Sequence, residues 1–147
     1  MIRLNWWGKD IKIEANLVTY DKVNLNQIKY AKGSVKNLNA KVPLLNKIIE
    51  RYDSPENVIG YVEIKESEDG KHIYGEGEIF NLTPEQKMVN TLIKNDFIAA
   101  LSFKANHVVF DKNDKSIVKS MKIIDTEIID IRNSANPENV LKIKEGE

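Results

Sequence analysis

Ser102 and Glu127 are the residues of this 147-residue chain whose types and surroundings could support catalysis. Ser102 lies in the apolar run Ala-Ala-Leu-Ser-Phe and Glu127 lies in Thr-Glu-Ile-Ile, so both segments are typical of buried strands. A serine becomes a nucleophile only beside a general base, and a carboxylate in an apolar segment needs a partner or a shifted pKa. Taken alone, the local pattern predicts a Ser102 hydroxyl bonded to backbone, so the two residues suggest a hydrolase without defining one.

A general base for such a hydrolase is scarce in the sequence. Histidine is the usual base near neutral pH, and the chain has only His72 and His107. The sequence pattern places neither histidine beside Ser102. Whether one of them could still act as the base for a catalytic Ser102 stays open.

Motifs for other chemistry do not occur. The absence of cysteine excludes disulfides, thiolate zinc sites and a cysteine nucleophile. Spacings typical of phosphate-binding loops, zinc proteases and calcium loops are also missing, so no cofactor and no metal ion are expected. Gly75 and Gly77 have no helix directly behind them, and we interpret them as strand glycines at a bend or bulge.

The charges of the chain cancel, because it has 22 basic and 22 acidic residues, and 19 of the basic residues are lysines. Proteins that bind nucleic acids usually have a basic excess and arginine contacts to phosphates, so no nucleic-acid partner is expected. No apolar run approaches the ~20 residues that cross a bilayer, and residues 1–10 lack the apolar core of a secretory signal. We therefore expect neither a membrane partner nor a secreted protein.

Alternation of apolar and polar residues predicts strands along most of the chain. The predicted segments are 11–18, 28–30, 42–45, 58–65, 72–80, 99–103, 108–110 and 116–131, the last of which is long enough to be bent or broken. Pro43 suits a strand start or an edge strand. Residues 46–56 combine helical spacing with a closing turn and stay unassigned. Turns or loops are predicted at 20–27 and 133–137, and Asp69-Gly70 is predicted to form a hairpin turn.

A capping box predicts one helix over residues 84–95. Thr83 supplies the N-cap hydroxyl, Pro84 suits the first helical position, and Gln86 completes the box. The chain as a whole is therefore predicted to be an α+β, mainly β domain over residues 11–147, a closed or nearly closed antiparallel β-barrel with a flanking helix. Residues 1–10 are predicted to form an N-terminal arm, in which Trp6 and Trp7 would either anchor a partner or close the barrel end.

Several short motifs occur in an order that resembles one protein family. They are residues 23–27 followed by Tyr30 and Gly33, Lys-Val-Pro-Leu-Leu at 41–45, Val-Ile-Gly-Tyr-Val at 58–62, Gly-Glu-Gly-Glu-Ile at 75–79, Ala-Leu-Ser at 100–102, and Glu-Ile-Ile at 127–129 followed by Ser-Ala-Asn-Pro at 134–137. Their order resembles the prohead proteases of tailed phages, serine proteases that mature viral capsids and share a β-barrel fold with herpesvirus assemblin. The resemblance implies that Ser102 occupies the nucleophile position and Glu127 another position of the triad.

The chain also departs from the family pattern. The family's catalytic histidine would fall near Tyr52 or Asp53, and no histidine occurs there. Lys104 stands where the family favours a glycine that lets the backbone approach the substrate. Members of the family commonly carry a C-terminal delivery extension, and none is expected here since the sequence stops soon after residue 137.

We therefore expect a phage or prophage capsid-associated structural protein, a decoration or cementing subunit built on an inactive prohead protease fold. Its expected partners are the major capsid protein or copies of itself, as an oligomer on the capsid. The expected location is the virion, after synthesis in the cytoplasm of the bacterial host. The alternative is an active prohead protease that cleaves scaffold and major capsid protein, with Ser102 as nucleophile and an unrecognised base.

Overall fold

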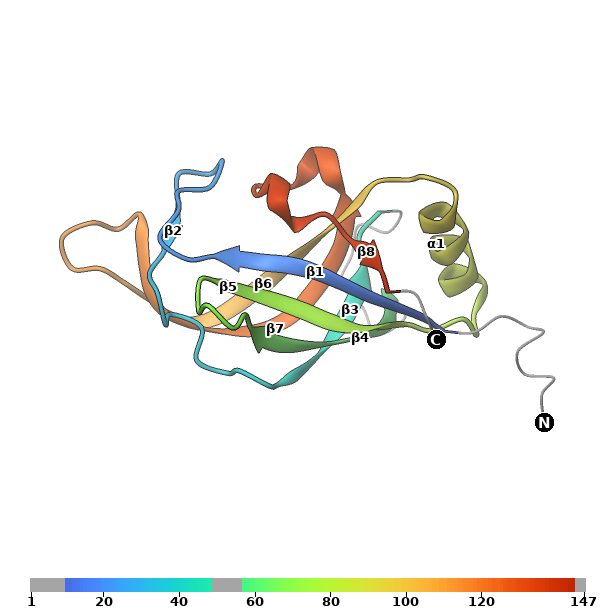
Figure 1. The fold of residues 1–147 in the computed structure, drawn as a ribbon, viewed down its shortest axis with the longest axis horizontal. Coiled ribbons are helices and arrows are strands. Elements are labelled where there is room, and N and C mark those ends of the chain that lie inside the picture. The colour runs from blue at the N-terminus through green and yellow to red at the C-terminus, as the bar shows by residue number, and fades with distance from the viewer. Residues whose placement is uncertain (1–9, 49–56, 145–147) are drawn as a thin grey trace.

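A computed structural model of the protein shows a strongly curled sheet with one α-helix at one end (Figure 1). The structure describes residues 10–48 and 57–144, so Trp6, Trp7, Tyr52 and Asp53 lie outside the described residues. The elements are β1 (Ile11–Thr19), β2 (Lys29–Tyr30), β3 (Lys41–Asn46), β4 (Val58–Glu66), β5 (His72–Ile79), α1 (Pro84–Lys94), β6 (Ala99–Phe110), β7 (Ile117–Asp130), the 3-10 helices η3 (Ile131–Asn133) and η4 (Pro137–Asn139), and β8 (Lys142–Ile143).

The predicted mainly β architecture with one flanking helix is confirmed, and the sheet is mixed and curls into an open half-barrel. Its long strands follow the order β6-β7-β3-β4-β5-β1, with β8 outside β1. Both β3 and the short β2 pair with β7 in parallel, whereas the other strand pairs are antiparallel. A parallel pair needs a long crossover connection, and the β4–β5 hairpin, α1 and β6 provide it between β3 and β7.

The gap between β1 and β6 is spanned by the segment 134–144, and we call this gap the seam. On the β6 side, Val140 forms a bridge with Ala100. On the β1 side, Ile143 of β8 pairs with Ile13. The sequence predicted only a polar turn for the start of this segment, so its role between the two strand edges and the strand β8 were missed.

Two of the long strands differ from their predictions. Residues 99–103 and 108–110 were predicted as separate strands, but β6 is continuous, and register shifts against β7 take up the irregular residues between them. Pro43 was predicted to suit a strand start or an edge, but β3 lies between β4 and β7. The proline is tolerated because the pairing with β7 begins only at Leu44. The carbonyl oxygen of Pro43 accepts a hydrogen bond from Thr126 Oγ1 at 3.0 Å.

The β4–β5 hairpin confirms the strand interpretation of the glycines. A Cβ atom on Gly77 would lie 1.9 Å from the carbonyl oxygen of Tyr61, and one on Gly60 equally close to that of Glu78. The two backbones therefore approach each other more closely than any larger residue allows, as in a sharply coiled sheet.

The core lies inside the curl, and α1 covers one end of it. The fully buried side chains come from alternate positions of the strands, among them Ile13, Ile64, Ile73 and Leu101. The capping box at Thr83 is present as predicted, and Val89 of the helix is fully buried in the same core. Figure 1 shows α1 at the opposite end of the sheet from the β6–β7 turn.

Candidate functional site

Ser102 and Glu127 are direct partners across the antiparallel β6–β7 pair. Directly opposed residues of an antiparallel pair share a face, with Cβ atoms about 4.5–5.5 Å apart. Both residues are half-buried. The structure thus brings together the two residues that the sequence singled out.

The carboxylate of Glu127 is engaged by a lysine. Lys104 Nζ lies 3.6 Å from Glu127 Oε2, and the Glu127 side chain is only 13 % exposed. Asp125 lies two residues before Glu127 on the same strand face, and its pKa is raised, first by burial and then by the negative charge of Glu127. Lys104 therefore places a cation beside two crowded carboxylates.

No base is hydrogen-bonded to Ser102 among the described residues. The Ser102 hydroxyl makes no hydrogen bond to any of them. His107 lies five residues farther along β6, about 16 Å at the usual rise of a strand, and its Nδ1 contacts Asn106 Oδ1 at 2.9 Å. His72 begins β5, where it is paired with Thr19 of β1. The predicted position of the lost base, near Tyr52 and Asp53, lies outside the described residues.

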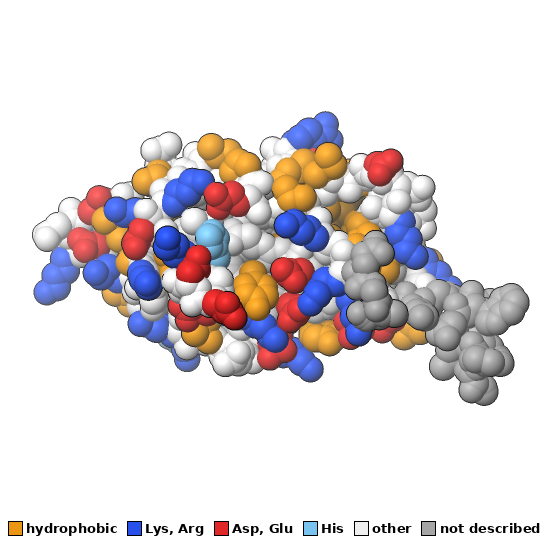
Figure 2. All heavy atoms as spheres, viewed as in Figure 1, with side chains coloured by type: hydrophobic (Ala, Val, Ile, Leu, Met, Phe, Trp, Pro, Cys, Tyr) orange, Lys and Arg blue, Asp and Glu red, His pale blue; other side chains and the backbone are white. Residues whose placement is uncertain are grey.

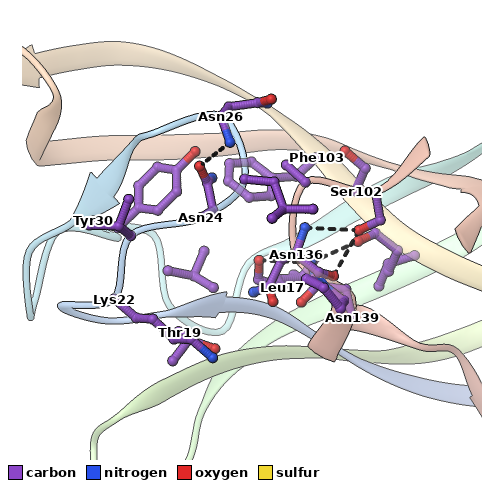
Figure 3. A pocket seen from close by; sticks show the side chains of 17 residues that line it. Leu17, Thr19, Lys22, Asn24, Asn26, Tyr30, Ser102, Phe103, Asn136 and Asn139 are labelled. Atoms are coloured by element: carbon purple, nitrogen blue, oxygen red, sulfur yellow. Dashed lines mark hydrogen bonds between the residues drawn. The ribbon is translucent and has the colours of Figure 1, made fainter. Parts of the chain in front are cut away.

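Ser102 also lines a pocket of about 370 Å³ at the seam (Figure 3). Its walls come from the end of β1, the loop 22–26, residues 101–103 of β6 and the segment 134–139. The size is in the range of pockets that hold small ligands. The sequence did not predict this pocket, because its two loops were interpreted only as turns and are more than a hundred residues apart.

Asn139 joins the two strand edges beneath the pocket. This buried side chain donates from Nδ2 to the carbonyl oxygens of Leu17 in β1 and Leu101 in β6, at 3.1 and 3.0 Å. Its Oδ1 accepts a hydrogen bond from Asn16 Nδ2 at 2.7 Å. One side chain therefore satisfies backbone groups that a missing strand would otherwise have to pair.

The walls of the pocket are tied to each other. Leu25 of one loop donates its backbone N–H to the carbonyl oxygen of Ala135 in the other, at 2.9 Å. The rings of Tyr30 and Phe103 are in contact, with centroids 5.9 Å apart. Burial raises the pKa of the Tyr30 phenol, so that group stays a neutral hydrogen-bonding partner.

The described parts of the chain hold no group of three metal-ligating side chains. No helix among them is long and apolar enough to cross a membrane. Figure 2 shows basic and acidic side chains interspersed over the face in view. Comparison of the chain with models of known families, with curated proteins and with solved structures finds no match.

Proposed function

We propose that this protein is a capsid-associated structural subunit of a phage or prophage, a decoration or cementing protein with a prohead-protease-like fold and no protease activity. The major capsid protein or further copies of the chain would be its partners, and the virion its location. The proposal includes the finer fold assignment, a barrel of the prohead protease and assemblin type in which the segment 134–144 covers the seam.

One observation carries the proposal. Ser102 faces Glu127 across β6 and β7, yet the Glu127 carboxylate is paired with Lys104 and no described base forms a hydrogen bond with the serine hydroxyl. A serine hydroxyl without a hydrogen-bonded base remains protonated and a poor nucleophile at neutral pH. The Lys104 side chain, which is 43 % exposed, lies where the family would bring backbone close to the substrate. The site therefore supports a retained scaffold better than a working triad.

The alternative, an active prohead protease, is favoured by one specific observation. Ser102 lies at the wall of a pocket large enough for a substrate side chain. An active enzyme would need a base from a residue outside the described ranges, and Tyr52 and Asp53 are the positions that the resemblance indicates.

Labelling by a fluorophosphonate probe, followed by mass spectrometry of the peptide that contains Ser102, tests the two functions. We expect no labelling of the wild-type chain, nor of Tyr52→His or Asp53→His alone, because Lys104 still occupies the substrate side of the serine. Combining Asp53→His with Lys104→Gly has the best chance of restoring labelling. Strong labelling of the wild-type Ser102 would establish a working base and make the protease the better assignment.

Gel analysis of purified particles tests the capsid assignment separately. A structural subunit is expected intact and at high copy number in mature particles. A maturation protease would instead be absent or self-cleaved, and a chain missing from particles at every stage would contradict both assignments.

A further inference from the structure

Two asparagines in the walls of the seam pocket have their side-chain oxygens fixed by the backbone. Asn24 Oδ1 accepts hydrogen bonds from the backbone N–H groups of Asn26 and Ile28, at 2.9 and 3.0 Å. Asn136 Oδ1 caps η4 by accepting from the N–H of Glu138 at 3.0 Å. A backbone N–H can only donate, so the atom bound in each case is the oxygen and the amide orientation is determined.

The amide nitrogens of both side chains remain available to a ligand. Neither Asn24 Nδ2 nor Asn136 Nδ2 donates a hydrogen bond to the described residues, and both side chains are half-buried in the pocket wall. They come from the two loops that border the pocket, as Figure 3 shows. Half-buried amide donors without partners are unfavourable unless water or a ligand accepts from them.

The charge of the pocket limits the kind of acceptor. Among the described residues that line it, Lys22 is the only charged one, and its Nζ is paired with Glu138 Oε2 at 2.8 Å. The charges of Lys22 and Glu138 nearly cancel, but the Lys22 ammonium has further N–H groups that do not bind Glu138. A singly charged acceptor therefore fits better than a phosphate, which carries close to two charges at neutral pH.

We propose that the seam pocket binds a carboxylate group, held by the Asn24 and Asn136 amides with support from the Lys22 ammonium. The carboxylate belongs either to a small free acid or to a peptide, as an acidic side chain or a C-terminus. The site needs neither a capsid nor a protease function, so its test is independent of both.

The test is a titration of the ¹⁵N-labelled full chain, with the side-chain NH₂ signals of Asn24 and Asn136 as the readout. The probes are N-acetylglycine, its neutral analogue N-acetylglycinamide, the peptide acetyl-Ala-Ala-Gly with a free C-terminus, and inorganic phosphate. We expect saturable shifts of both NH₂ signals with the two carboxylates only. Tighter binding of the peptide than of N-acetylglycine would assign the site to peptides, and the reverse to small acids.

Asn24→Asp and Asn136→Asp are the matched variants, because aspartate keeps the turn or cap oxygen and replaces only the amide donor. Each is expected to weaken carboxylate binding about tenfold or more, since a charge-assisted hydrogen bond is replaced by repulsion. Asn113→Asp adds the same charge in the exposed β6–β7 turn and should leave binding unchanged. Equal binding of N-acetylglycinamide, preferred binding of phosphate, equal weakening by Asn113→Asp, or no shift with any probe would each overturn the proposal.

Discussion

Replacing Asn139 by alanine should destabilise the protein more than any other change of an asparagine to alanine at the seam. The substitution removes the two hydrogen bonds to the carbonyls of Leu17 and Leu101 and the one accepted from Asn16. A typical net value of about 1 kcal/mol for each bond gives a loss of about 3 kcal/mol. The variant also leaves the two buried carbonyls without a hydrogen-bond donor, which adds a desolvation cost. The loss of about 3 kcal/mol is therefore the lower end of the expected destabilisation.

Thermal and urea unfolding measure this loss. A loss of about 3 kcal/mol corresponds to a drop of about 6–12 °C in Tm for a domain of this size. The control is Asn113→Ala, an exposed turn residue, which should stay within about 0.5 kcal/mol of the wild type.

Asn139→Asp tests the loss of the Nδ2 donor by itself, because aspartate has nearly the same volume as asparagine. The new carboxylate would face two carbonyl oxygens, so this variant should be at least as unstable as Asn139→Ala at neutral pH. Its deficit should shrink as the pH falls, because a protonated carboxyl can donate one hydrogen bond. If Asn139→Ala loses less than about 1 kcal/mol, the hydrogen bonds across the seam contribute far less than we infer.

Two further predictions concern the sheet. Gly77→Ala should prevent stable folding, because the new Cβ would lie 1.9 Å from the Tyr61 carbonyl oxygen. Circular dichroism and the yield of soluble protein measure the loss of folding. A native spectrum with an unchanged Tm would contradict the close approach of the two strands. Asp125→Asn should be more stable than the wild type at neutral pH and lose this advantage in acid. The reason is that the pKa of Asp125 is raised in the folded state by burial and by Glu127, so the native protein binds the extra proton and stability falls as pH rises from the unfolded pKa through the folded one. Urea unfolding near pH 7 and near the unfolded pKa of about 3.9 measures the difference, and an advantage that does not change with pH would refute the cause given.

The parts of the fold that the sequence predicted are those with local signals. The capping box at Thr83 determined the helix start, and the Asp69-Gly70 turn between two alternating segments predicted the β4–β5 hairpin. Both depend on residues a few positions apart. The break predicted within β6 has a local cause too, because His107 adopts a positive φ of 52° inside a bulged region whose composition resembles a turn.

The mixed sheet and the pocket could not be predicted in the same way. The parallel pairing of β3 with β7 joins Leu44 to Thr126. The alternation of apolar and polar residues shows that a segment forms a strand, but not which distant strand it pairs with. Ser102 and Glu127 were identified separately, but their direct opposition depends on the register of β6 against β7. The pocket needs Asn24 and Asn136 on two facing loops, and each asparagine by itself is typical of an ordinary turn.

The bonds of Asn139 across the seam also affect how the protein is made. Leu17 lies 122 residues before Asn139 and Leu101 lies 38 before it, so a ribosome delivers both strand edges long before the side chain that joins them. Until residues 134–144 leave the exit tunnel, the nascent chain has two unpaired edges and an uncovered core between them. Such an intermediate is prone to aggregation and a natural substrate for chaperones. Completion of the fold is therefore expected to be a late, abrupt event during synthesis rather than a gradual one.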